Sequence, residues 1–241
     1  MSLDIATIVD RCNEPGNQNR RIIKLTDKIV VKRNATPEEV ANQNYAYLTC
    51  MQSDCGLRIP KVYGYFIQLE IGYLVMEFID GTSLIDIIIA RKFFDLQCLA
   101  TAIHALATRM QQSFPGPANH GLSRGYLFSD DGAETNFTSI ESLNSWLNER
   151  ALFVDDEPVF KFELSDCVFC HLDLASRNII VLPDGSFGLL DWEYAGFYPK
   201  AFETYCLRFI AQNQDYNSSF AQSLSEALEN ISPQKTSDKL I

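Results

Sequence analysis

The segment from Val168 to Trp192 constrains this chain more than any other: it reads V-F-C-H-L-D-L-A-S-R-N-I-I-V-L-P-D-G-S-F-G-L-L-D-W. The run from Asn178 to Leu182 is mostly apolar and β-branched, which is typical of a buried strand. The following Pro183-Asp184-Gly185-Ser186 favours a tight turn. Phe187 to Leu190 then predicts a returning strand. The segment therefore predicts a β-hairpin.

Three polar residues surround this hairpin: Asp173, Asn178 and Asp191. If Leu182 pairs with Phe187, Asn178 lies directly opposite Asp191, and opposed Cβ atoms are roughly 4.5–5.5 Å apart. Two oxygen-bearing side chains at that separation can share Mg²⁺. Asp173 would face the same opening, as a carboxylate that orients an attacking hydroxyl and accepts its proton. The alternative is that the three polar residues merely lie on the surface of a hairpin without a chemical role. The spacing H-x-D-x-x-x-x-N, followed by an Asp after an apolar run, instead favours a functional site.

This segment resembles the catalytic loop and metal-binding Asp of the aminoglycoside phosphotransferase and choline kinase-like family, which is related to the protein kinases. The string L-D-W-E-Y-A-G-F-Y-P, residues 190–199, is similar to that of fungal members of the phosphotransferase enzyme family. The resemblance implies that Asp173 is the catalytic base and that Asn178 and Asp191 bind Mg²⁺. It also implies that His171 is a structural residue of the loop.

The string H-L-D-L-A-S-R-N also resembles the catalytic loop of protein tyrosine kinases. Against that interpretation, Asp191 is followed by Trp192 instead of Phe-Gly, and no A-P-E string follows. The fifty residues after Asp191 are too few for an activation segment and the usual helical lobe. The sequence therefore favours a small-molecule kinase over a protein kinase.

The upstream half is expected to supply a nucleotide-binding lobe. Residues 21–25 and 28–32 predict a hairpin, and Lys32 at its end resembles the kinase strand lysine that holds the nucleotide's phosphates. Residues 59–66 and 72–78 predict two further strands, of which the second resembles the family's hinge strand. That resemblance places Met76 at the back of the nucleotide pocket. The backbone groups expected to contact the purine are those of Glu77, Phe78 and Ile79.

Between these strands, Thr36-Pro37-Glu38-Glu39 predicts the start of a helix. We expect its buried stripe to consist of Val40, Tyr47, Leu48 and Met51. The family's helix Glu, which pairs with the strand Lys, is expected near Asn44, which is an amide, and Glu38 and Glu39 are expected to lie too early. Lys32 is then positioned either by Asn44 or by another carboxylate. The loop expected to cover the phosphates also departs from the glycine-rich pattern G-x-G-x-x-G, because residues 13–19 contain a single glycine, Gly16.

The remainder of the chain predicts the second lobe. Helical periodicity covers residues 84–90, 95–110 and 140–152. One hypothesis is that a group of acidic residues attracts a cationic acceptor. The group consists of Asp130, Asp131, Glu134 and residues 155–157. The alternative is that these acids lie in solvated loops. Arg177 is expected to neutralise nearby charge, and Glu193 and Tyr194 are expected on the acceptor side.

Composition limits the classes of function. A net charge of −11 disfavours nucleic-acid binding, and 46% apolar residues fit a folded enzyme. No apolar run approaches a membrane span, and the N-terminus does not resemble a signal peptide. Seven irregularly spaced cysteines do not suggest a secreted disulfide framework. Cys167-x-x-Cys170 is interpreted as two buried thiols, because a zinc site would need a second pair of ligands. A cytoplasmic location is therefore expected.

Together these observations predict an α+β, two-lobed, protein kinase-like fold. Residues 1–79 form the nucleotide-binding lobe with a hinge near 76–80, and residues 80–241 form the catalytic and acceptor-binding lobe, with residues 232–241 as a disordered tail. The predicted activity is transfer of the γ-phosphate of ATP, or alternatively GTP, to a hydroxyl of a small molecule, with Mg²⁺. The other class considered is a nucleotide-binding pseudokinase with a sensing or scaffolding role. The sequence does not indicate the acceptor or the oligomeric state.

Overall fold

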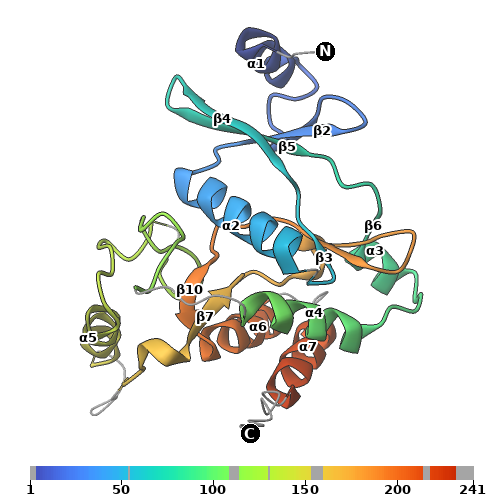
Figure 1. The fold of residues 1–241 in the computed structure, drawn as a ribbon. Coiled ribbons are helices and arrows are strands. Elements are labelled where there is room, and N and C mark those ends of the chain that lie inside the picture. The colour runs from blue at the N-terminus through green and yellow to red at the C-terminus, as the bar shows by residue number, and fades with distance from the viewer. Residues whose placement is uncertain are drawn as a thin grey trace, which may run out of the picture.

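The computed structural model of the chain describes residues 4–53, 55–108, 114–129, 131–152, 160–213 and 218–231. These residues form an upper part that is rich in β-strands and a lower part that is mainly helical (Figure 1). This arrangement confirms the predicted α+β class. The predicted disordered tail, residues 232–241, lies outside the described residues.

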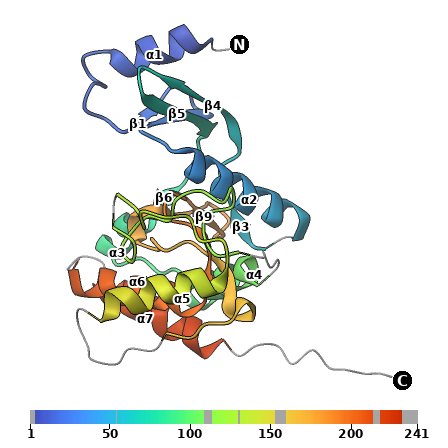
Figure 2. The same ribbon diagram turned by 90° about the vertical axis from the view of Figure 1, so that its left-hand side faces the viewer.

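The upper part is a four-stranded antiparallel sheet in the order β1 (Ile22–Lys24), β2 (Ile29–Arg33), β5 (Ile71–Glu77) and β4 (Val62–Gln68). The predicted hairpin is confirmed, with Ile22 opposite Lys32. Helix α1 (Ile5–Asn13), which the sequence analysis did not identify, covers this sheet (Figure 2). Its buried side chains, those of Ile8, Val9 and Cys12, pack against apolar residues of the three strands β1, β2 and β5. These strand residues are Ile23, Val31, Tyr73 and Val75.

Helix α2 (Pro37–Ser53) begins where it was predicted, and the Thr36 hydroxyl accepts the Glu39 N–H at 3.2 Å. The predicted buried stripe is wrong: Leu48 and Met51 are 55% and 68% exposed, and Val40 and Tyr47 are only half-buried. The buried face is instead mostly polar: Glu39, Asn42, Gln43, Ala46 and Thr49.

That face can be polar because it meets partners from the lower part. The Asn42 side chain donates to the carbonyls of Trp192 (3.2 Å) and Ala195 (2.7 Å). At the end of α2 a disulfide joins Cys50 to Cys55. The sequence analysis did not foresee this bridge, because nothing local to the two cysteines indicates that their Cα atoms approach to 5.0 Å.

The lower part contains a second four-stranded sheet, in the order β3 (Leu57–Arg58), β9 (Phe187–Leu189), β8 (Ile179–Val181) and β6 (Thr82–Ser83). A separate pair joins β7 (Cys167–Cys170) to β10 (Gly196–Pro199). The lower helices are α3 (Leu84–Ile89), α4 (Leu96–Ala107), α5 (Ile140–Ala151), α6 (Ala201–Asn213) and α7 (Ser218–Asn230), with short 3₁₀ turns η1 (Leu164–Asp166) and η2 (Ser176–Asn178).

The helices predicted over residues 84–90 and 140–152 are confirmed to within one residue at each end. The helix predicted over residues 95–110 begins with Asp95 as its cap and ends at Ala107, and residues 109–110 lie outside the described part. The thiols of Cys167 and Cys170 are free and buried, as predicted. No described helix is both long enough and apolar enough to span a bilayer.

The catalytic-segment hairpin forms, but its predicted register is wrong by one residue. Val181, not Leu182, pairs with Phe187, so Asn178 is opposite Leu190, whose N–H donates to the Asn178 carbonyl at 2.8 Å. The reason lies in the turn: the Leu182 N–H donates to Ser186, and Gly185 adopts φ +84°. Ser186 thereby joins the ladder and leaves a three-residue loop that ends in a left-handed glycine.

Candidate active site

The cavity between the upper and lower parts has a volume of about 440 Å³. Its lining includes every residue that the sequence analysis assigned to nucleotide or metal: Lys32, Met76, Glu77, Phe78, Ile79, Asn178 and Asp191. Apolar side chains, among them Val30 and Ile180, form the wall on either side. Residues far apart in the chain therefore meet around one space large enough for a ligand.

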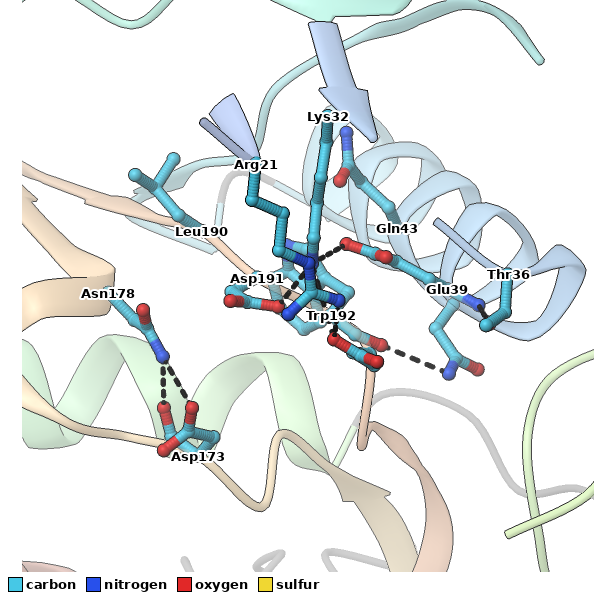
Figure 3. Close-up of polar contacts among 12 residues, drawn as sticks. Arg21, Lys32, Thr36, Glu39, Gln43, Asp173, Asn178, Leu190, Asp191 and Trp192 are labelled. Atoms are coloured by element: carbon cyan, nitrogen blue, oxygen red, sulfur yellow. Dashed lines mark hydrogen bonds and ion pairs between the residues drawn. The ribbon is translucent and has the colours of Figure 1, made fainter. Parts of the chain in front are cut away.

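Lys32 is fully enclosed at one end of this cavity, with a side chain only 2% exposed. Its Nζ lies 2.5 Å from Glu39 Oε1, 2.7 Å from Asp191 Oδ1 and 3.5 Å from Glu193 Oε2 (Figure 3). Burial alone would lower the Lys32 pKa, but the charges of Glu39 and Asp191 outweigh it and raise the pKa. Lys32 is therefore a fixed cation.

Glu39, and not Asn44, is the helix partner of Lys32. The expectation that Glu39 lies too early on α2 is wrong, because the helix starts at Pro37, soon after β2 ends at Arg33. Its first turns therefore lie beside the end of the lysine strand. Burial raises the pKa of Glu39 to about 7, against the opposing charge of Lys32. Its Oε2 is buried and has no hydrogen-bond partner among the described residues.

Asp191 reaches Lys32 by a route that the predicted register did not include. The residue has φ +63°, so the chain turns directly after β9. Its neighbour Trp192 is fully buried and donates its indole N–H to the Leu189 carbonyl at 3.2 Å, which holds the turn in place. Burial would raise the pKa of Asp191, but Lys32 outweighs it and lowers the pKa. Asp191 is therefore a carboxylate at neutral pH.

Asp173 is buried in the loop before η2 and accepts hydrogen bonds from three side chains. Its Oδ2 accepts from Asn178 Nδ2 at 2.8 Å and from Arg177 at 2.6 Å, and its Oδ1 accepts from the Tyr126 hydroxyl at 3.1 Å. Since the Asn178 amide nitrogen faces Asp173, its oxygen points away from Asp173 (Figure 3). Arg177, which was predicted to neutralise nearby charge, thus forms an ion pair with the carboxylate of Asp173.

Helix α6 supports this loop from behind. The carboxylate of Glu203 accepts the backbone N–H of His171 at 2.6 Å and of Leu172 at 3.0 Å, and burial raises its pKa to about 7. The His171 Nδ1 accepts the Asp173 N–H at 3.2 Å, so its Nε2 carries the hydrogen and donates to the Leu190 carbonyl at 2.8 Å. His171 therefore links the loop to the hairpin, as expected of a structural residue. The sequence analysis missed Glu203, whose only signal was an acid among apolar helix positions.

A second, smaller cavity of about 160 Å³ adjoins the first. Its lining is almost wholly polar: Arg21, Tyr126, Asp173, Arg177, Asp191, Glu193 and Tyr194. It shares Arg177 and Asp191 with the larger cavity. Glu193 and Tyr194, which the sequence analysis expected on the acceptor side, both line this cavity, whereas Arg21 and Tyr126 were missed because they come from distant segments.

The two described members of the predicted acidic group, Asp131 and Glu134, do not line this cavity. Asp131 and Glu134 are exposed, and Glu134 lies 3.7 Å from Arg150. Asp130 and residues 155–157 lie outside the described part of the chain. The acids that do face the smaller cavity are Asp173, Asp191 and Glu193.

The donor set at the junction of the two cavities suits Mg²⁺. Asn178 and Asp191 offer oxygen ligands on one wall, and Mg²⁺ in nucleotide sites is typically held by one or two such residues together with phosphates and water. Among the described residues, no group of three or more His, Cys, Asp or Glu side chains is arranged so that it could hold a metal ion by itself. The residues present therefore fit a metal that arrives with a phosphate ligand.

The profile of the phosphotransferase enzyme family matches residues 13–230. The chain belongs to this family. It is therefore a small-molecule kinase with a hydroxyl group as phosphate acceptor, as the resemblance of its catalytic segment implied. No curated protein matches the chain in sequence.

Solved structures share its fold. The apo form of a thermostable variant of the aminoglycoside phosphotransferase APH(4)-Ia is 17% identical, with a TM-score of 0.56 over 87% of this chain and 74% of that one. A ternary complex of a related variant with AMP-PNP and hygromycin B is 15% identical, with a TM-score of 0.57 over 92% and 82%. Choline kinase LicA from Streptococcus pneumoniae is 23% identical over 87% and 71%, with a TM-score of only 0.43. The first two confirm the predicted protein kinase-like fold.

Proposed function

We propose that this protein transfers the γ-phosphate of ATP to a hydroxyl of a small molecule, with Asp173 as the catalytic base. The observation that carries this proposal is the junction of the two cavities at Asp191, with Lys32 on the nucleotide side and Asp173 on the acceptor side. A phosphate at that junction lies between a fixed cation and a carboxylate able to receive a proton. Phosphoryl transfer requires little more than such positioning and charge stabilisation.

The larger cavity is the proposed nucleotide site. The N–H groups of Glu77 and Phe78 already donate to the carbonyls of Lys61 and Lys28, each at 2.9 Å. A purine donor or acceptor would therefore meet the carbonyl of Glu77 and the backbone of Ile79, with Met76 behind it. These contacts suit either ATP or GTP, and residues 76–80 form the hinge between the proposed lobes 1–79 and 80–241.

Asn178 and Asp191 would hold Mg²⁺, which supplies charge neutralisation for the nucleotide's phosphates. Lys32 would contact the same phosphates while Glu39 keeps its ammonium in place. Asp173 would accept the proton of the acceptor hydroxyl. Its three hydrogen-bond donors hold the carboxylate in one orientation, so that it need not reorganise during transfer.

The smaller cavity is the proposed acceptor site. Three carboxylates and two arginines face it, so it favours an acceptor that carries a cationic group beside its hydroxyl. Hygromycin B, which the related APH(4)-Ia variant binds in its ternary complex, is an aminoglycoside-type ligand of that protein. For the present chain the proposal is limited to the class of hydroxylated small molecules, with amines tested first.

ATP turnover across a panel of hydroxylated amines, sugars and amino acids tests this function. We expect Mg²⁺-dependent ADP release with at least one acceptor, and loss of turnover in Asp191→Ala. Thermal-shift titration with ATP, with and without Mg²⁺, accompanies the panel. Nucleotide binding without turnover of any acceptor would instead support the pseudokinase alternative, which the poor loop at residues 13–19 motivates. Unchanged turnover in Asp191→Ala would contradict the metal assignment.

A further inference from the structure

Residues 13–19, the predicted phosphate-covering loop, contain a single glycine, Gly16. Residues 14–20 form a run of turns after α1, and two of their N–H groups, those of Asn17 and Arg20, donate within the run. Among the described residues, none from 14–20 lines either cavity, and neither does the turn between β1 and β2. Backbone amides of a covering loop are therefore not available at the junction, where a transferred phosphoryl group needs compensation of its charge.

Arg21 occupies that place. It directly precedes β1, and its carbonyl accepts the Arg33 N–H at 2.8 Å, so its backbone is fixed to the lysine strand. Its guanidinium lines the smaller cavity and lies close to Lys32 and Asp191 (Figure 3). There it forms an ion pair with Glu193 of the lower part. The side chain is 45% exposed, so the guanidinium can change partner without a movement of the strand.

The charges around Arg21 explain why it would leave Glu193 for a phosphate. Lys32 and Arg21 face three carboxylates, those of Glu39, Asp191 and Glu193. Mg²⁺ bound at Asp191 would neutralise part of this negative charge, and the phosphates would bring new negative charge beside the two cations. A guanidinium binds phosphate through paired, charge-assisted hydrogen bonds that a single carboxylate oxygen does not match.

We propose that Arg21 contacts the terminal phosphate of the nucleotide and that Glu193 holds it in place until the nucleotide binds. This inference rests on the proposed function and adds a residue to it. During transfer the bond from the γ-phosphorus to the bridging oxygen breaks, a bond to the acceptor oxygen forms, and the acceptor proton passes to Asp173. Arg21 supplies only charge to this step, in place of the loop amides.

The test compares the affinities of ATP and ADP, because only ATP carries the γ-phosphate that Arg21 is proposed to contact. Dissociation constants are measured with Mg²⁺ and without acceptor for the full chain, Arg21→Gln, Arg21→Lys, Glu193→Gln and the double variant. Arg21→Gln should weaken ATP binding by about tenfold and ADP binding by less than about twofold. Arg21→Lys, which retains one charge, should fall between the wild type and Arg21→Gln. Arg20→Gln, at the exposed neighbouring arginine, is the matched control and should leave the ratio unchanged.

Glu193→Gln gives an effect of opposite sign. Removal of the competing carboxylate should tighten ATP binding by roughly threefold, and this gain should disappear in the double variant, since Arg21 is then absent. A gain that persists in the double variant would mean that Glu193 acts through Lys32 alone and would overturn the proposal. Equal weakening of ATP and ADP in Arg21→Gln would also overturn it and leave a simple ion pair between the two parts.

Failure of this inference is distinct from failure of the proposed function. If the wild-type chain binds ATP and turns it over, and Arg21→Gln does not change the ratio of the two affinities, only the role of Arg21 is rejected. If the wild-type chain binds neither ATP nor ADP with Mg²⁺ present, the proposed function is rejected and this inference with it. Melting temperatures of all variants show that each is folded, and an ion pair this exposed should contribute little to them.

Discussion

The two cavities of this protein differ in what lines them. The larger one is lined mainly by apolar surface, whereas the smaller one is lined almost entirely by charged side chains and tyrosines. An apolar slot suits a flat base, and a polar pocket suits a hydroxylated molecule whose proton must be removed. Since the two share Asp191 and Arg177, the proposed function assigns nucleotide binding to one side of a single site and acceptor activation to the other. Variants on the two sides should therefore have different kinetic signatures.

The largest expected effect is on the acceptor side. Asp173→Asn removes the proposed catalytic base, so kcat should fall by about 10³-fold while the dissociation constant of ATP stays within about twofold. Single-turnover kinetics and ATP titration measure the two quantities separately. Asp131→Asn, at an exposed acid outside both linings, is the control and should keep full activity. A comparable loss of ATP affinity in Asp173→Asn would remove the distinction between the cavities.

On the nucleotide side, Glu39→Gln should have an intermediate effect. Lys32 loses its buried ionic partner on α2, so both the ATP dissociation constant and kcat should worsen by about tenfold. Asn44→Ala is the matched comparison, because the sequence analysis named that amide as one of two alternatives for the partner of Lys32. Its change should be less than about twofold. If Asn44→Ala proves as severe as Glu39→Gln, the role assigned to Glu39 is wrong.

The smallest effect on activity is expected behind the loop. Glu203→Gln keeps the volume but sets an amide against two N–H donors, so kcat should fall by roughly threefold to tenfold with ATP affinity unchanged. Glu226→Gln, an exposed change on α7, serves as the control. A loss of ATP affinity as large as the loss of kcat would mean that Glu203 supports the nucleotide side instead.

Glu203 also predicts a pH dependence of stability. Its pKa rises from 4.5 to about 7 on folding, so the folded chain binds more protons than the unfolded chain between these values. The contribution of Glu203 to the free energy of unfolding, on the order of 3 kcal/mol at most, should therefore be lost as pH rises from 4.5 to about 7. Glu203→Gln should flatten this slope in urea titrations across that range. An identical slope in the two proteins would show that Glu203 does not titrate there.

Much of the fold followed from residues close together in the sequence. The hairpin around Pro183-Asp184-Gly185-Ser186 and the helix start at Thr36 depend on turn and cap chemistry within a few residues. The hairpin register did not follow, because loops of three and four residues fit the same letters. Only the observed bond from Leu182 to Ser186 distinguishes them.

The polar face of α2 shows a second limit. A search for apolar periodicity assigned Leu48 and Met51 to the core, but that criterion assumes that a buried face must be apolar. Here the helix lies against a site that supplies ionic and hydrogen-bond partners, so Glu39 and Asn42 are buried instead. Nothing in the helix sequence itself identifies those partners.

The sequence by itself determined which residues are candidates for the chemistry: the spacing of Asp173, Asn178 and Asp191 and the lysine at a strand end are local patterns. The tertiary structure decided how that chemistry is held. Lys32 and Asp191 are 159 residues apart, and Arg21 and Glu193 are 172 residues apart. Such contacts depend on how two parts of the chain pack, and no local preference of either residue encodes them. For that reason the carboxylate that holds Lys32 and the arginine at the junction of the cavities became visible only in the fold.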